Sequence, residues 1–117
     1  MREVLMALAL AAGVRAAVGT TAVGTAAVDV RTFQFREAAL EIPVGTAVVW
    51  SNRDAIEHTV TSGVPDSADG AFAGRLADSG ATFSHSFDRA GSYRYFCDRH
   101  RFMRGEIRVV PLTHGEP

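Results

Sequence analysis

The stretch GSYRYFCDRHRFMRGEIRVV, residues 91–110, contains two runs of alternating side chains around a short polar loop. Tyr93, Tyr95 and Cys97 stand at every second position, so they face one side of an extended strand. Ile107 and Val109 repeat this alternation after the loop. A period of two that breaks briefly and resumes predicts two β-strands joined by a loop.

The same alternation recurs throughout residues 27–111, and no convincing period of 3.6 is present. Turn-forming residues separate the runs, while Gly63–Gly80 is predicted as a loop with one short strand around Ala71–Leu76. About seven short strands at this spacing predict an all-β fold, an antiparallel Greek-key β-sandwich. The alternating positions are Val28, Val30, Phe33 and Phe35, then Leu40, Ile42 and Val44, then Val48 and Trp50, then Thr59 and Thr61, and Phe83, His85 and Phe87.

Composition limits the function classes. The 117 residues allow one domain, and 12 basic against 13 acidic residues give a net charge of −1, which excludes a polyanion-binding composition and so a nucleic-acid partner. Hydrophobic residues make up 47% and charged residues 21%, as in a packed domain. The single cysteine, Cys97, excludes an internal disulfide and a four-cysteine metal site.

The N-terminus resembles an export signal. Residues 4–14 form an apolar run of 11 residues, too short for the roughly 20 of a membrane-spanning helix. Small residues follow at Ala17-Val18-Gly19 and Gly24-Thr25-Ala26, as signal peptidases require. We therefore expect a signal peptide over residues 1–26 and a periplasmic or secreted protein without stable membrane insertion. An uncleaved N-terminal anchor is the alternative, and residues 112–117 are expected to be a flexible tail.

Three side chains that can bind a soft metal ion lie within seven residues of the polar loop. Cys97, His100 and Met103 stand at intervals of three, so a thiolate, an imidazole and a thioether can converge on one point. His58 begins a strand just after a polar loop and can face the same end of the sandwich. Two histidines, one cysteine and a weak axial methionine are the ligands of a blue-copper electron-transfer site.

Other interpretations stay open at this point. Zinc also binds Cys and His, although it has little use for a thioether. A Cys97 nucleophile activated by His100 would make the protein an enzyme, although no third orienting group is evident. His85 alternates with Phe83 and is expected to be a strand histidine rather than a ligand, and His114 lies in the tail.

Two segments resemble the ligand segments of the small blue copper proteins, the cupredoxins. They are VVWSNRDAIEHTV, residues 48–60, and residues 91–110, and the two-residue gaps between the candidate ligands are most similar to those of the amicyanins in the plastocyanin-like group. FAGRLADSG, residues 72–80, and FSHSFDRAGSYRYFC, residues 83–97, also resemble plastocyanin-like domains, so the resemblance extends from Val28 to Val110.

The resemblance implies one type 1 copper ion that alternates between Cu(I) and Cu(II). Its ligands by position would be His58, Cys97, His100 and Met103. Asn52 matches an asparagine that forms hydrogen bonds between the two ligand-bearing loops of the family.

The sequence departs from the amicyanins where they have prolines beside the ligands. Glu57 stands before the first histidine, and Arg99 and Arg101 flank the second. Unlike proline, Arg99 has a backbone N–H, which we expect to donate to the Cys97 sulfur. Such a bond would favour Cu(I).

The implied function is electron transfer between redox partners outside the cytoplasm, without enzymatic activity. We expect a monomer with His100 as the electron port, Phe102 in the docking patch, and Arg99, Arg101 and Arg104 around them to steer an acidic partner. Partners would be redox proteins such as a c-type cytochrome or a periplasmic dehydrogenase. A copper carrier or chaperone and a non-redox cupredoxin-like binding module are the alternatives.

Overall fold

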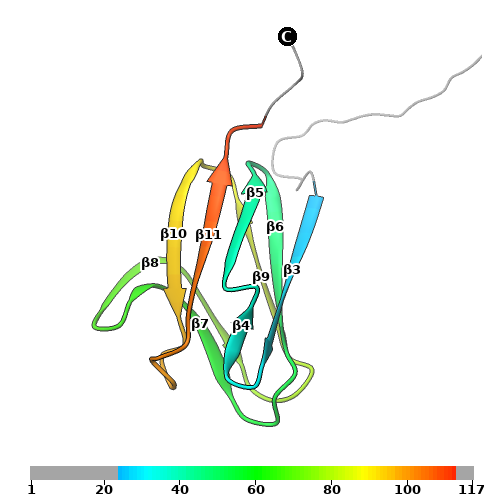
Figure 1. Ribbon diagram of the computed structural model, residues 1–117, viewed down its shortest axis with the longest axis vertical. Coiled ribbons are helices and arrows are strands. Elements are labelled where there is room, and N and C mark those ends of the chain that lie inside the picture. The colour runs from blue at the N-terminus through cyan, green and yellow to red at the C-terminus, as the bar shows by residue number, and fades with distance from the viewer. Residues whose placement is uncertain (1–23, 113–117) are drawn as a thin grey trace, which may run out of the picture.

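The computed structural model describes residues 24–112, which form two β-sheets packed face to face (Figure 1). Five strands lie in the order β5-β11-β10-β7-β8, and four in the order β4-β3-β6-β9. The predicted all-β sandwich is confirmed. The strands are β3 (Gly24–Arg31), β4 (Gln34–Arg36), β5 (Ala39–Pro43), β6 (Thr46–Asn52), β7 (His58–Val64), β8 (Ser67–Leu76), β9 (Thr82–Phe87), β10 (Gly91–Phe96) and β11 (Arg104–Val110).

The alternating side chains fill the space between the sheets. In β6, every second residue is buried, and Val48 and Trp50 have no exposed surface. The Trp50 ring meets Tyr95 of the opposite sheet edge-on, with 5.4 Å between the ring centroids. Trp50 thus lies in the core as predicted, and it connects the sheet of β6 to the sheet that carries Cys97.

Both sheets are mixed, so the sandwich is not antiparallel throughout as the sequence predicted. β3 pairs with β6 and β5 pairs with β11 in parallel, whereas the other pairs are antiparallel. Four connections, β3–β4, β6–β7, β8–β9 and β10–β11, consequently lie at one end of the sandwich (Figure 1). The termini of the described chain lie at the opposite end. Segments that are about forty residues apart in sequence therefore meet at the first end.

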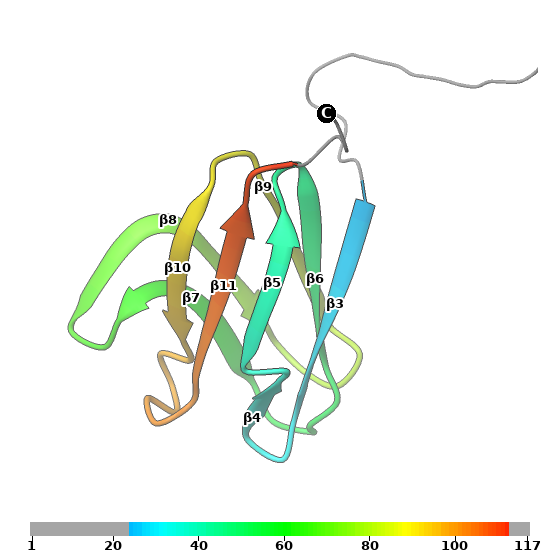
Figure 2. The same cartoon turned by 45° about the horizontal axis from the view of Figure 1, so that its top comes forward.

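The segment Gly63–Gly80 differs from its prediction. It contains a ten-residue strand, β8, that forms a hairpin with β7, and Figure 2 shows this hairpin extending beyond the sandwich. The short strand expected around Ala71–Leu76 is present, but it already begins at Ser67. The expected loop is wrong for Ser67–Gly70, because the Gly, Ala, Ser and Asp residues at the start of β8 give no apolar alternation. A register shift between Thr61 and Gly63 marks where the hairpin leaves the body of the fold.

The N-terminal prediction is only partly within the described residues. β3 begins at Gly24, and Gly24, Thr25 and Ala26 pair with Thr46–Val48 of β6. Residues 1–23 and 113–117, which include His114, lie outside the described residues, so the signal peptide and the tail remain predictions. Within residues 24–112, no helix is long and apolar enough to cross a membrane.

Candidate metal centre

The loop after β10 is closed by its own backbone. The Cys97 N–H donates to the Met103 carbonyl oxygen at 3.2 Å, and the Met103 N–H donates to the His100 carbonyl oxygen at 2.9 Å. Cys97 and Met103 are both buried at this closure, and His100 is half-buried. Three of the predicted ligands are thus held in one compact turn.

His58 reaches the same place from β7. The Cys97 Sγ atom lies 3.8 Å from His58 Nδ1 and 3.7 Å from His100 Nδ1. One donor atom from each of the three residues lies within 4.8 Å of the others. His58 and Cys97 have no exposed surface, so His100 is the imidazole nearest to solvent.

These distances are short enough for one metal ion to be bound by all three donors. A thiolate and two imidazoles beside a methionine are the donor set of blue copper, whereas structural zinc has little use for a thioether.

The His100 ring nitrogen is available for a metal at neutral pH. Burial lowers the pKa of His100, and the positive charges of His58 and Arg99 lower it further, while Asp54 opposes them. A lowered pKa keeps the imidazole neutral, which is the form that binds metal.

Residues 22–110 match the family of copper binding proteins described as the plastocyanin/azurin family. The chain belongs to this family. Amicyanin-alpha from Methylorubrum extorquens is 33% identical over 101 residues, which are 86% of this chain and 85% of the relative. Among solved structures, a purple cupredoxin from Nitrosopumilus maritimus is 28% identical with a TM-score of 0.67, covering 73% of this chain and 99% of that one. A reduced tryptophan-to-tyrosine variant of amicyanin is 31% identical with a TM-score of 0.66, covering 77% and 86%.

Family membership and the donor set agree on the cofactor. As a plastocyanin/azurin-family protein with two imidazoles and one thiolate gathered at one point, the chain takes type 1 copper. It is an electron carrier and not an enzyme, as the resemblance implied. The zinc and thiol-nucleophile interpretations are thereby set aside.

The Cys97 sulfur accepts a hydrogen bond from a residue that sequence analysis did not select. The Thr59 N–H donates to Cys97 Sγ at 3.3 Å, so this bond belongs to Thr59 and not to Arg99. Thr59 Oγ1 also accepts the Asp98 N–H at 2.7 Å. The residue after one ligand therefore fixes the loop of another. Thr59 and Cys97 are 38 residues apart in the sequence, so the sequence alone gives no sign of this contact. The contact follows from the pairing of β7 with β10.

Asn52 is buried and organises the loop before His58. Its Nδ2 donates to the Ile56 carbonyl oxygen at 2.9 Å and to the Leu76 carbonyl oxygen at 3.3 Å, and its Oδ1 accepts the Asp54 N–H at 2.9 Å. These bonds stay within the β6–β7 loop and the end of β8. The contacts between the two ligand-bearing loops come from Thr59 instead and from the ion pair described next.

The arginines beside the ligands are ion-paired. Glu57 bonds Arg75 through one carboxylate oxygen and Arg99 Nη1 through the other, the latter at 3.2 Å. The bond from Arg75, helped by the charges of both arginines, holds the pKa of Glu57 below its usual range. Glu57 and Arg99 thus join the two ligand-bearing loops.

A missed residue, Asp54, touches a ligand directly. Its Oδ2 lies 2.7 Å from His58 Nε2, the ring nitrogen that faces away from Cys97. Burial would raise the pKa of Asp54, but hydrogen bonds from Phe33 and His58 lower it below its usual value. A carboxylate on the second nitrogen of a metal-binding histidine fixes the ring and its tautomer.

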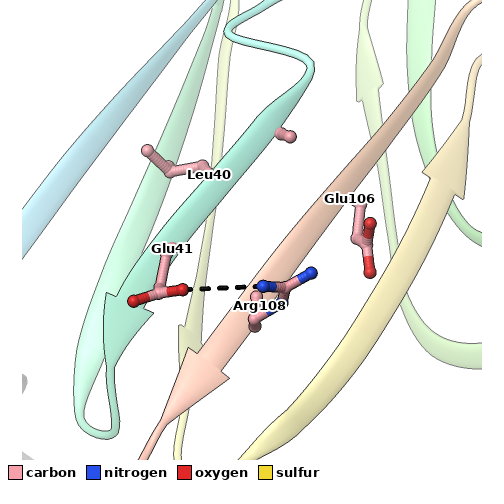
Figure 3. A pocket seen from close by; sticks show the side chains of 5 residues that line it. Leu40, Glu41, Glu106 and Arg108 are labelled. Atoms are coloured by element: carbon pink, nitrogen blue, oxygen red, sulfur yellow. Dashed lines mark ion pairs between the residues drawn. The ribbon is translucent and has the colours of Figure 1, made fainter.

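Two other features lie apart from the ligands. His85, in β9, packs between Phe72 and Phe87 at centroid distances of 5.0 and 4.8 Å. A hollow of about 140 Å³ is lined by residues of β5 and β11, and Arg108 Nη1 lies 3.8 Å from Glu41 Oε1 there. Figure 3 shows these side chains. Among residues 24–112, His58, Cys97 and His100 form the one group of three or more His, Cys, Asp or Glu donors close enough for a metal.

Proposed function

We propose that His58, Cys97, His100 and Met103 would hold the type 1 copper, with the Met103 thioether as the weakest donor. The observation that carries this is the convergence of one thiolate and two imidazoles at 3.7 and 3.8 Å. Met103 supports it by closing the same loop through its backbone bond to Cys97. Asn52 holds the loop that delivers His58.

Copper supplies a one-electron couple between Cu(I) and Cu(II). The chain keeps the ligands in one geometry for both states, because the β10–β11 loop is closed by backbone hydrogen bonds and His58 is fixed by Asp54. Small rearrangement on electron transfer follows from this rigidity. His100 is the electron port since it is the half-exposed imidazole, and Phe102 beside it is 70% exposed.

Electron exchange is proposed to occur with redox proteins, such as a c-type cytochrome or a dehydrogenase, by a monomer in the periplasm or outside the cell. Complete burial of Cys97 and His58 favours electron transfer over a copper carrier, which must release its ion. The export signal would lie within residues 1–26. A cut after Gly19 is favoured over one after Ala26, because residues 24–26 belong to β3. Mass measurement of the exported chain distinguishes the two cuts.

The copper assignment is tested by colour. The Cu(II)-loaded protein should show an intense visible thiolate-to-copper band that a reductant removes and an oxidant restores without loss of metal. Cys97→Ser should abolish the band. The matched control His85→Ala should keep it, because His85 lies between Phe72 and Phe87, away from the ligand group. Bleaching in the control, or colour in Cys97→Ser, contradicts the assignment, and loss of copper on reduction supports a carrier.

A further inference from the structure

The turn between β3 and β4 is built from residues that do not favour it. Thr32 and Phe33 have φ values of +50° and +59° and lie between the paired residues Arg31 and Gln34. A two-residue hairpin turn of this kind requires positive φ at both central positions and usually contains Asn or Gly. A β-branched and an aromatic residue are strained there, so contacts elsewhere must hold the turn.

Asp54 supplies those contacts. Its Oδ1 accepts the Thr32 N–H at 2.8 Å, and its Oδ2 accepts the Phe33 N–H at 3.0 Å. The same Oδ2 lies 2.7 Å from His58 Nε2. The Asp54 backbone is itself fixed, because its N–H donates to the buried Asn52 side chain at 2.9 Å. One carboxylate therefore binds both the strained turn and an imidazole of the metal centre.

The turn places the Phe33 ring on the metal centre. The ring lies edge-on to His58 and His100, with centroid distances of 5.2 and 4.9 Å and interplanar angles of 88°. It also stacks with Phe102 at 6.4 Å. Phe33 is 36% exposed, so its ring stands between solvent and the two imidazoles.

We propose that Asp54 is a positioning residue that fixes the His58 imidazole and, through the Thr32–Phe33 turn, the aromatic cover over both imidazoles. This inference rests on the proposed copper site. It predicts that the reduction potential of the centre and the protection of the Thr32 and Phe33 amides from hydrogen exchange depend on the same carboxylate. Phe33 is then held in a strained conformation because that conformation covers the copper ligands.

The electronic part is tested with Asp54→Asn. A carboxylate that accepts the imidazole N–H makes the ring a better donor, which favours Cu(II). The neutral amide has only one acceptor oxygen, so it cannot accept from Thr32 as well as from Phe33 and His58, and it places no negative charge on the imidazole N–H. We therefore expect a higher reduction potential at fixed pH. The expected change is at least threefold in the equilibrium constant with a reference couple, or about 28 mV at 59 mV per tenfold. The visible band should remain.

The matched control is Asp98→Asn. Asp98 directly follows Cys97 and carries the same charge, but its side chain pairs only with Arg101, at 3.9 Å, among the described residues. This variant should shift the equilibrium constant by less than half the Asp54→Asn change. Equal shifts in the two variants would mean that charge alone is responsible and would overturn the role of the His58 bond.

The turn is tested on the protein as isolated, whichever metal it holds. In Asp54→Asn, hydrogen exchange at the Thr32 and Phe33 amides should be at least tenfold faster, with exchange in β6 and β10 unchanged.

A double-mutant cycle of Asp54→Asn and Phe33→Gly tests the link between the turn and the metal centre. The measured quantity is the rate at which the reduced protein loses copper to a chelator. The Phe33→Gly effect should be at least halved in the Asp54→Asn background. Unchanged exchange or additive effects would overturn the proposal, even if the copper band confirms the site.

Discussion

His85 and His100 show how the same side chain acquires different roles from its surroundings. Burial among Phe72 and Phe87 lowers the pKa of His85, and the nearby Asp88 opposes this only in part. His100 has a lowered pKa from burial and from neighbouring positive charge, and it faces a thiolate sulfur. The first imidazole is a packing residue, whereas the second is placed to serve as the proposed metal donor.

His85 should make stability depend on pH. Its pKa in the folded protein lies below the ordinary value of 6.5, so the unfolded chain takes up the proton first as pH falls. The free energy of unfolding should be highest above pH 6.5 and should decrease below it. His85→Gln should lose less stability than the wild type between pH 8 and pH 5 in urea titrations. An equal loss in both proteins would show that His85 is hydrated in the folded state.

Residue spacing predicted the ligands but not their hydrogen-bond partners. Cys97, His100 and Met103 lie within one loop, so their intervals of three were visible in the sequence. No spacing or motif in the sequence singles out Asp54 or Thr59. Thr59 reaches the Cys97 sulfur only because β7 lies beside β10, and Asp54 would need the β3–β4 turn to be placed first.

At the scale of elements, the β7–β8 hairpin uses side-chain hydrogen bonds where the backbone pairing of its two strands is interrupted. At the register shift, Ser62 Oγ donates to Asp69 Oδ1 at 2.6 Å and accepts the Phe72 N–H at 2.9 Å. The Ala71 N–H also donates to Asp69 at 3.0 Å. The fold was predictable where apolar residues alternate, as in β6, but this hairpin was not, because polar groups specify it.

Ser62→Ala should therefore destabilise the protein by about 1–3 kcal/mol, because it leaves the buried Phe72 N–H unpaired. It should also reduce the acid sensitivity of the protein. The Ser62 bond lowers the pKa of Asp69 in the folded state, so its stabilisation is present above pH 3.8 and is lost as pH falls through the folded pKa. Urea titrations at pH 7 and pH 3 measure both effects, and Ser86→Ala, at an exposed position in β9, is the control.

Gly63 sets the path of the same hairpin. It has a φ of +107°, and a Cβ there would lie 2.5 Å from the Ser67 carbonyl oxygen. Gly63→Ala must shift backbone atoms, so we expect a lower melting temperature than for Gly70→Ala. Gly70 is the matched control, because it also has positive φ, +77°, but open space around the Cβ position. Equal melting temperatures would mean that the hairpin relaxes freely.

At the scale of the whole molecule, the ligand end is less basic than the sequence suggests. Arg101 pairs with Asp66 at 2.8 Å, and Arg99 pairs with Glu57 at 3.2 Å. Asp66 comes from the β7–β8 hairpin, which Figures 1 and 2 show beside the β10–β11 loop. The arginines around His100 were expected to steer an acidic partner, but carboxylates from other elements offset two of them.

Electron exchange with an anionic reagent should therefore depend weakly on salt. Steering requires net charge near the port, and at 0.1 M ionic strength screening acts over about 10 Å. Asp66→Asn leaves Arg101 with only the longer contact to Asp98, at 3.9 Å, so the positive charge at the port increases. The rate with hexacyanoferrate should then be higher than that of the wild type at low salt and should fall more steeply as salt is added. Stopped-flow rates at several ionic strengths measure this slope.

The matched variant Asp88→Asn separates local charge from net charge. It removes the same unit charge, but Asp88 lies between β9 and β10 at the opposite end of the sandwich from the ligand loops. If charge at the port controls encounter, the salt dependence of Asp88→Asn should resemble that of the wild type. Equal slopes for the two variants would mean that the reagent responds to net charge alone. In that case the Arg101–Asp66 pair would have no bearing on how redox partners approach His100.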